Sequence, residues 1–122
     1  MERYKGLFVI LDANLFPMGS RRRALISHLA SALKDFRSMG YRVVGVVVED
    51  DLEDSLAELG FQFDSVERVE GDFAPVAWSV ARRLSLNVKR SLLCSADVSH
   101  ANWAQDAGLR RFMMLERLLS HG

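Results

Sequence analysis

Continuous apolar runs alternate along this chain with segments in which apolar residues recur every three or four positions. Residues 7–11 form an unbroken apolar run, which is typical of a strand buried on both faces of a parallel sheet. Residues 42–48 and 90–96 are also apolar and rich in β-branched or small residues, so they predict two more buried strands. Residues 111–115 predict a last strand near the C-terminal end.

The segments between these runs have helical spacing. A long helix of about five turns is predicted after Ser20, a candidate N-cap, and it ends at Gly40. Its apolar face consists of Leu25, Ile26, Leu29, Leu33, Phe36 and Met39. Shorter helices are predicted at residues 52–59 after an aspartate cap, after Asp72 as far as Leu84, from the cap Ser99 to Ala107, and around Leu118 and Leu119.

Residues 61–70 differ from the other predicted strands because they carry charge in their middle. A charged strand is tolerated at the edge of a sheet and not at its centre. The chain therefore predicts an α/β fold with three αβα layers, Rossmann-like, around a five-stranded parallel sheet of order 3-2-1-4-5. The alternative order 2-1-3-4-5 would bury the charged strand. We expect residues 1–122 to form one domain without a cap domain.

Candidate chemistry lies where the predicted strands end. Asp12 and Asn14 follow the first strand, and Asp97 follows the fourth. In open α/β sheets the ligand site lies beyond the carboxyl ends of the strands, and Mg²⁺ is usually held there by one or two carboxylates with water and phosphate oxygens. Asp12 and Asp97 are the candidate metal ligands. The acids Asp50, Asp51 and Asp72 are better explained as helix caps.

Three consecutive arginines, Arg21, Arg22 and Arg23, open the first predicted helix. Positive charge is unfavourable at a helix N-terminus, so the cluster suggests an anion-binding role toward a phosphate near Asp12. Three solvated arginines are the simpler alternative. Cys94 is expected to be a small core residue. His100, beside Ser99 and Asp97, could face the site, but a position on a surface helix is favoured.

The segment Leu-Phe-Val-Ile-Leu-Asp-Ala-Asn, residues 7–14, resembles the first motif of the haloacid-dehalogenase-like (HAD) phosphohydrolases, an apolar strand followed by Asp-x-Asp. The resemblance implies that Asp12 is a nucleophile that attacks a phosphoryl group with Mg²⁺ bound nearby. It places Asn14 at the second catalytic position and Asp97 as a metal ligand. Ser95, at the end of the fourth predicted strand, joins Arg21, Arg22 and Arg23 as a candidate phosphate-binding residue.

Other family motifs are altered in this chain. Where the second motif has Ser or Thr there are Val47, Val48 and Glu49, and residues 71–75 contain no counterpart of the phosphate-binding lysine. Asn14 cannot protonate a leaving group, because an amide does not titrate. The sequence therefore predicts a HAD-like phosphohydrolase-type domain with a degraded active site, in which Mg²⁺-dependent chemistry is residual or lost.

Two other resemblances leave alternatives open. Asp12, Ser95 and Asp97 with the total length are similar to a response-regulator receiver, which implies a non-catalytic regulatory or binding module and a buried third strand. The segment Asp-Ala-Asn-Leu-Phe with the acids around residues 70–72 is similar to PIN-like (NYN) ribonucleases, which bind metal through such acids. These functions rank second and third.

The overall composition limits the classes of binding partner that we expect. Sixteen basic residues balance sixteen acidic ones, so we expect no nucleic-acid or membrane partner. The single cysteine and the absence of a leader-like segment indicate a cytoplasmic protein. The expected partners are a phosphorylated small molecule or another protein, and the apolar residues 112–114 on an edge strand would suit a homodimer.

Overall fold

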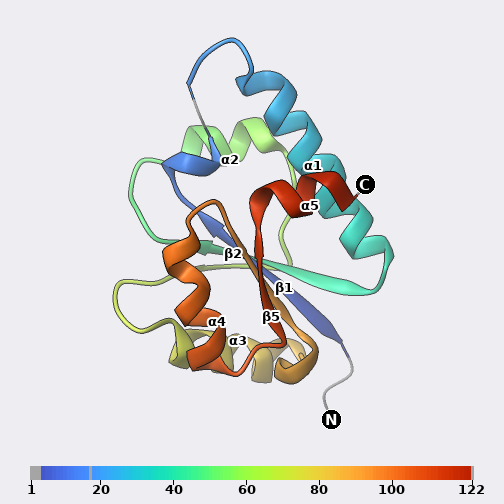
Figure 1. Cartoon of the computed structure of the whole chain (residues 1–122), viewed down its shortest axis with the longest axis vertical. Coiled ribbons are helices and arrows are strands. Elements are labelled where there is room, and N and C mark those ends of the chain that lie inside the picture. The colour runs from blue at the N-terminus through green and yellow to red at the C-terminus, as the bar shows by residue number, and fades with distance from the viewer. Residues whose placement is uncertain (1–3, 17, 122) are drawn as a thin grey trace.

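The computed structural model describes residues 4–16 and 18–121, in which helices and strands alternate around a parallel sheet (Figure 1). The strand order is β3-β2-β1-β4-β5, which confirms the predicted order and the edge position of the third strand. The strands are β1 (Lys5–Leu11), β2 (Tyr41–Val47), β3 (Ser65–Arg68), β4 (Leu92–Ser95) and β5 (Arg111–Met114). The helices are α1 (Arg22–Ser38), α2 (Glu53–Leu59), α3 (Phe73–Leu84), α4 (Ala101–Ala107) and α5 (Leu115–His121), with short 3₁₀ turns at Ala13–Leu15, Val88–Arg90 and Val98–His100.

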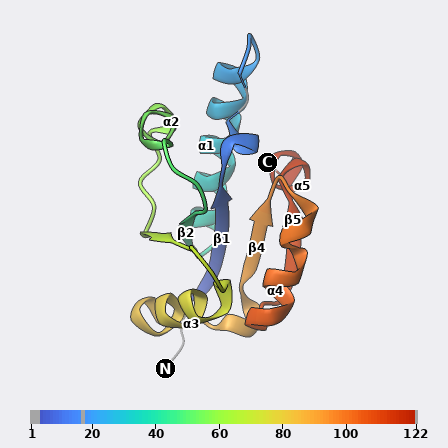
Figure 2. The same cartoon turned by 90° about the vertical axis from the view of Figure 1, so that its left-hand side faces the viewer.

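β1 is the central strand, and its side chains alternate between two hydrophobic cores. Leu7, Val9 and Leu11 pack on the side covered by α1, α2 and α5. Phe8 and Ile10 pack on the opposite side, which α3 and α4 cover. Figure 2 shows β1 and β4 running in the same direction between β2 and β5. Because both faces of β1 are buried, its unbroken apolar sequence is explained.

The edge strand β3 is shorter than the predicted residues 61–70. Ser65–Arg68 pair with β2, and the N–H groups of Asp64 and Val69 donate to the Val43 and Val47 carbonyls at either end. Phe61 is buried before the strand begins, and its ring meets Phe63 edge-on with centroids 5.0 Å apart. These two rings belong to the core beneath α1 and α2, so the apolar residues at the start of the segment are used for packing and not for pairing.

Gly45 lies in the middle of β2, where its lack of a side chain creates room. A Cβ atom at this position would lie 2.9 Å from the Leu11 Cδ1 atom and 3.4 Å from the ring of Phe63. The glycine therefore lets Phe63 approach the sheet beside β1, and any larger residue here would overpack the core.

Three helix starts differ from the predictions. Ser20 does not cap α1; it lies in a turn in which the Arg22 N–H donates to the Gly19 carbonyl at 3.2 Å, and the N-cap is Arg21. Asp51 does not cap α2 either, because its φ of 64° is left-handed and Leu52 occupies the N-cap position. Ser99 does not begin α4. None of the helices in residues 4–16 and 18–121 combines the length and the apolar character needed to cross a membrane.

Candidate functional site

Asp12 ends the central strand and begins a 3₁₀ turn. Its side chain is only 7% exposed, and its Oδ1 atom accepts a hydrogen bond from the Leu15 N–H at 3.2 Å. Burial raises the pKa of Asp12 above its ordinary value, and the negative charge of Glu49 raises it further. The Leu15 N–H and the nearby His100 lower the pKa, but they do not offset the burial. A carboxylate in this environment is a candidate functional group, because acids with a shifted pKa are often found at functional sites.

Glu49 reaches the same place from the end of β2. Its carboxylate accepts a hydrogen bond from the Ala13 N–H, next to Asp12 in the chain. Asn14 lies in the same turn with its side chain exposed. A second negative charge therefore lies beside Asp12 and occupies one of the backbone donors of the turn.

The end of β4 forms a second part of the site. Ser95 is fully buried, and its Oγ atom lies 2.8 Å from the Nδ1 atom of His100 while it accepts the Asp97 N–H at 3.0 Å. Asp97 in turn accepts the Ser99 N–H at 2.9 Å through Oδ1, and hydrogen bonding from Ser99 lowers the pKa of Asp97. Asp97, and not Ser99, is thus the residue that caps the turn before α4.

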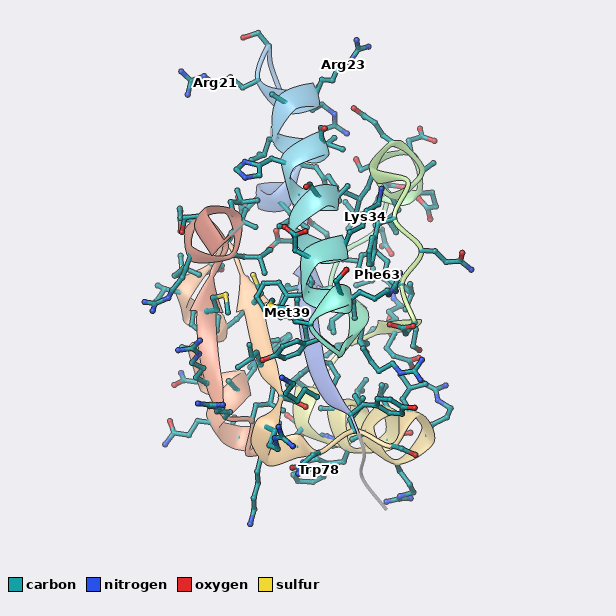
Figure 3. The ribbon with its side chains drawn as sticks, turned by 90° about the vertical axis from the view of Figure 1, so that its right-hand side faces the viewer. Arg21, Arg23, Lys34, Met39, Phe63 and Trp78 are labelled. Atoms are coloured by element: carbon teal, nitrogen blue, oxygen red, sulfur yellow. The ribbon has the colours of Figure 1, made fainter. Side chains whose placement is uncertain are left out.

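The three arginines do not form a cluster around Asp12. Arg22 donates to the Phe16 carbonyl at 3.0 Å, to Ser55 at 2.8 Å and to Glu58 at 3.1 Å, so it fastens the start of α1 to α2. Arg21 and Arg23 are exposed at the tip of α1, and Figure 3 shows both side chains pointing outward from the fold.

Known proteins were compared with the chain by sequence and by structure. No family model matches the sequence, and no curated protein matches it. A solved structure from Mesorhizobium loti, of a protein provisionally named a HAD-like phosphatase, superimposes with a TM-score of 0.57 at 15% identity, covering 89% of this chain and 71% of that one.

The chain has a HAD-like fold. The strand order is the order that the phosphohydrolase resemblance implies, and it differs from the 2-1-3-4-5 order of a receiver. At 15% identity the likeness concerns the fold alone. The chemistry depends on the residues at the strand ends.

The donors at the strand ends can be compared with what Mg²⁺ requires. Within residues 4–16 and 18–121 there is no group of three or more His, Cys, Asp or Glu side chains that could hold a metal. Asp12 accepts the Leu15 N–H through Oδ1, and Asp97 accepts the Ser99 N–H through Oδ1, so both carboxylates already have backbone donors. Two carboxylates with water and phosphate oxygens meet the ordinary requirement of Mg²⁺. The donor types therefore suit Mg²⁺, but the described residues form no preformed cage.

Sequence reasoning missed the positions of two side chains. His100 is not a surface residue: it is half-buried, bound to Ser95, and its ring lies 4.6 Å from that of Trp103. Glu49 follows the second strand, and nothing in the sequence indicated its bond to Ala13. The spacing of Ser95 and His100, five residues apart around an Asp-capped turn, is the signal that could have indicated their contact.

Replacing Ser95 with alanine is expected to lower the free energy of unfolding by about 1–2 kcal/mol, because the Asp97 N–H and the His100 ring both lose a partner. Urea unfolding followed by circular dichroism measures the change. Ser120→Ala is the control, since Ser120 is exposed and bonds only within α5. If the two variants are equally stable, Ser95 does not organise this turn.

Replacing Asp12 with asparagine is expected to stabilise the fold at pH 7. The pKa of Asp12 is higher in the folded state than its ordinary value near 3.8, because the buried carboxylate is harder to ionise. The protonated side chain therefore carries no such penalty at low pH, and the folded state loses stability as the pH rises through the folded-state pKa. The neutral amide removes that pH-dependent loss. Urea unfolding at several pH values between 7 and 4 should show an advantage for the variant that shrinks toward pH 4. A variant less stable than the parent at pH 7 would contradict this expectation.

Proposed function

We propose that the chain is a HAD-like phosphohydrolase-type domain with a degraded active site, in which Asp12 retains residual Mg²⁺-dependent phosphoryl chemistry. The observation that carries the proposal is the buried, raised-pKa carboxylate of Asp12 at the end of the central strand of a HAD-like fold. A buried carboxylate of this kind lowers the stability of the fold. A functional role, in which a ligand binds to its negative charge, would explain its presence.

In the proposed reaction an Asp12 oxygen forms a bond to phosphorus, and the bond between phosphorus and the leaving oxygen breaks. The leaving oxygen takes its proton from water, because the amide of Asn14 has none to give. A second water then attacks the phosphorus, releases phosphate and restores the Asp12 carboxylate. A bound Mg²⁺, held by Asp12 and Asp97, would supply neutralising charge.

The substrate class that fits this reaction is a phosphorylated small molecule, and the site offers it little positive charge. Arg22 binds Glu58 and Ser55, while Arg21 and Arg23 point outward (Figure 3). Glu49 adds a negative charge beside Asp12. Phosphoryl transfer depends on cations and donors aimed at the transferring group. Slow turnover is therefore part of the proposal.

A Mg²⁺ titration followed by amide NMR shifts tests the proposal. We expect weak, saturable shifts in residues 12–15 and 95–99, and we expect Asp12→Asn to abolish them. Asp35→Asn, which removes an exposed carboxylate from α1, should leave them unchanged. No shifts at millimolar Mg²⁺ would refute a working metal site.

A non-catalytic binding module is the second candidate. The hydrogen bond from the Ala13 N–H to the Glu49 carboxylate favours it. Because this N–H already has an acceptor within the protein, it is not available to an anionic ligand. In that case the ligand would be a protein partner, and a pairing through the β5 edge would give a homodimer. The nuclease alternative has less support, because no three acids converge within the described residues.

A further inference from the structure

A cavity of ≈ 380 Å³ lies between α3 and α4, apart from the strand-end carboxylates. Asp72 and Trp78 line it from the α3 side, and Trp103 and Asp106 line it from α4. Its size is within the usual range of small-molecule sites. Trp78 lies at the end of the molecule opposite Arg21 and Arg23 (Figure 3).

The aromatic walls of the cavity are held in place. The Trp78 indole N–H donates to the Ala107 carbonyl at 2.9 Å, which ties α3 to α4, and the side chain is still 48% exposed. Trp103 stacks on Phe73 with centroids 5.4 Å apart and an interplanar angle of 9°. Trp78 therefore presents a fixed and accessible aromatic surface. An exposed tryptophan held in one orientation is a favourable surface for a ligand, because little side-chain freedom is lost on binding.

The charged groups of the cavity are both acidic. Asp72 occupies the N-cap position of α3 but makes no side-chain capping bond. One of the two backbone donors that an N-cap normally uses is missing, because the third helical residue is Pro75. Asp106 is exposed on α4. Neither acid has an ion-pair partner within the part of the chain that the structure describes, and no lysine or arginine lines the cavity there.

We propose that this cavity binds a small quaternary ammonium cation of the choline kind. The exposed ring of Trp78 is of the kind that attracts cations, and the two carboxylates add charge of the right sign. Trp103, whose ring contacts Phe73 and His100, forms the wall beside it. An anion drawn to the start of α3 would be repelled by Asp72 and Asp106. A hard metal ion prefers oxygen ligands and gains little from indole rings, whereas a quaternary ammonium ion gains from both the rings and the carboxylates. This proposal does not depend on the phosphohydrolase proposal, since it uses neither Asp12 nor Asp97.

Intrinsic fluorescence tests the proposal directly, because the chain has two tryptophans and both line the cavity. The full chain is titrated with choline chloride at constant ionic strength. The matched probe is 3,3-dimethylbutan-1-ol, which has the same shape without the charge. We expect a saturable change with choline and none with the alcohol at equal concentration. An equal response to the alcohol, or to sodium or calcium chloride, would overturn the proposal.

Substitutions locate the site. Asp72→Asn and Asp106→Asn should each weaken choline binding about three- to fivefold, the usual range of an exposed charge pair. Trp78→Leu should weaken it by a similar factor, with the response of Trp103 as the signal. Asp35→Asn is the control and should leave the affinity unchanged. Circular dichroism confirms that each variant is folded. Unchanged affinity in the folded Asp72→Asn/Asp106→Asn double variant would overturn the assignment to this cavity.

Discussion

Replacing Phe8 with alanine is expected to lower the free energy of unfolding by about 3–5 kcal/mol. Phe8 is 1% exposed on the central strand, and its ring meets that of Phe73 edge-on with centroids 5.7 Å apart. The truncation would leave a cavity between β1 and the start of α3, where the neighbouring side chains are also buried and cannot fill it. Urea unfolding monitored by circular dichroism measures the loss.

Val66→Ala is the control for this experiment. Val66 lies on the edge strand β3 and is 50% exposed, so its truncation should change the stability by about 0.5 kcal/mol or less. A loss below about 1 kcal/mol for Phe8→Ala would mean that α3 does not pack over β1 as described.

The second large effect is expected at Asp64, just before β3. Its Oδ2 atom accepts the Val43 N–H at 2.7 Å and binds Arg37 at 3.1 Å, so one carboxylate joins β2, the end of α1 and the edge strand. Asp64→Ala leaves the N–H of Val43, a fully buried residue, without its side-chain acceptor, and we expect a loss of about 1.5–3 kcal/mol. The loss is measured by urea unfolding.

Asp64→Asn separates the two contributions. The amide oxygen can still accept the Val43 N–H, whereas the ion pairs with the partly exposed Arg37 and Arg42 are removed. Because exposed ion pairs contribute about 0–1 kcal/mol, most of the stability should return in this variant. If asparagine is as harmful as alanine, the charge and not the backbone bond is what holds the edge.

The sheet could be predicted from the sequence because apolar patterning and burial coincide in it. Residues 7–11 are apolar throughout, and β1 is buried on both faces. The charged segment that contains Glu67 could belong only to an edge, and β3 lies at one. These are properties of single segments, which a sequence displays directly.

The helix starts and the strand-end site depend on contacts between distant segments. Arg22 was predicted to meet a phosphate, and it instead meets Glu58, 36 residues later in the chain. Glu49 reaches the Ala13 N–H from a neighbouring strand, over the same sequence separation. Tertiary geometry determines which residues pair. The sequence contains several acids and several donors of the same chemical type, so it does not show which of them are in contact.

The site residues remain predictions in their chemical roles. The structure places Asp12, Ser95 and Asp97 at the ends of adjacent strands, as the topology required, and it places Arg21 and Arg23 elsewhere. The local environment of Asp12 combines burial with a neighbouring carboxylate, that of Glu49. This combination raises the pKa of Asp12, and under the proposed function it would also weaken the binding of a phosphorylated substrate.

The most direct test of this account is the Mg²⁺-dependent hydrolysis of p-nitrophenyl phosphate by the parent chain and by Asp12→Asn. Loss of a single transition-state donor typically costs about 10²–10³ in turnover. Ordinary enzymes have kcat/KM values of ~10⁴ M⁻¹s⁻¹ or more, and we therefore expect the kcat/KM of the parent chain to be at least a hundredfold lower. For Asp12→Asn we expect the hydrolysis rate to fall to that of the uncatalysed reaction. A parent value within the ordinary range would contradict a degraded site. Equal rates for the two proteins would contradict residual chemistry at Asp12.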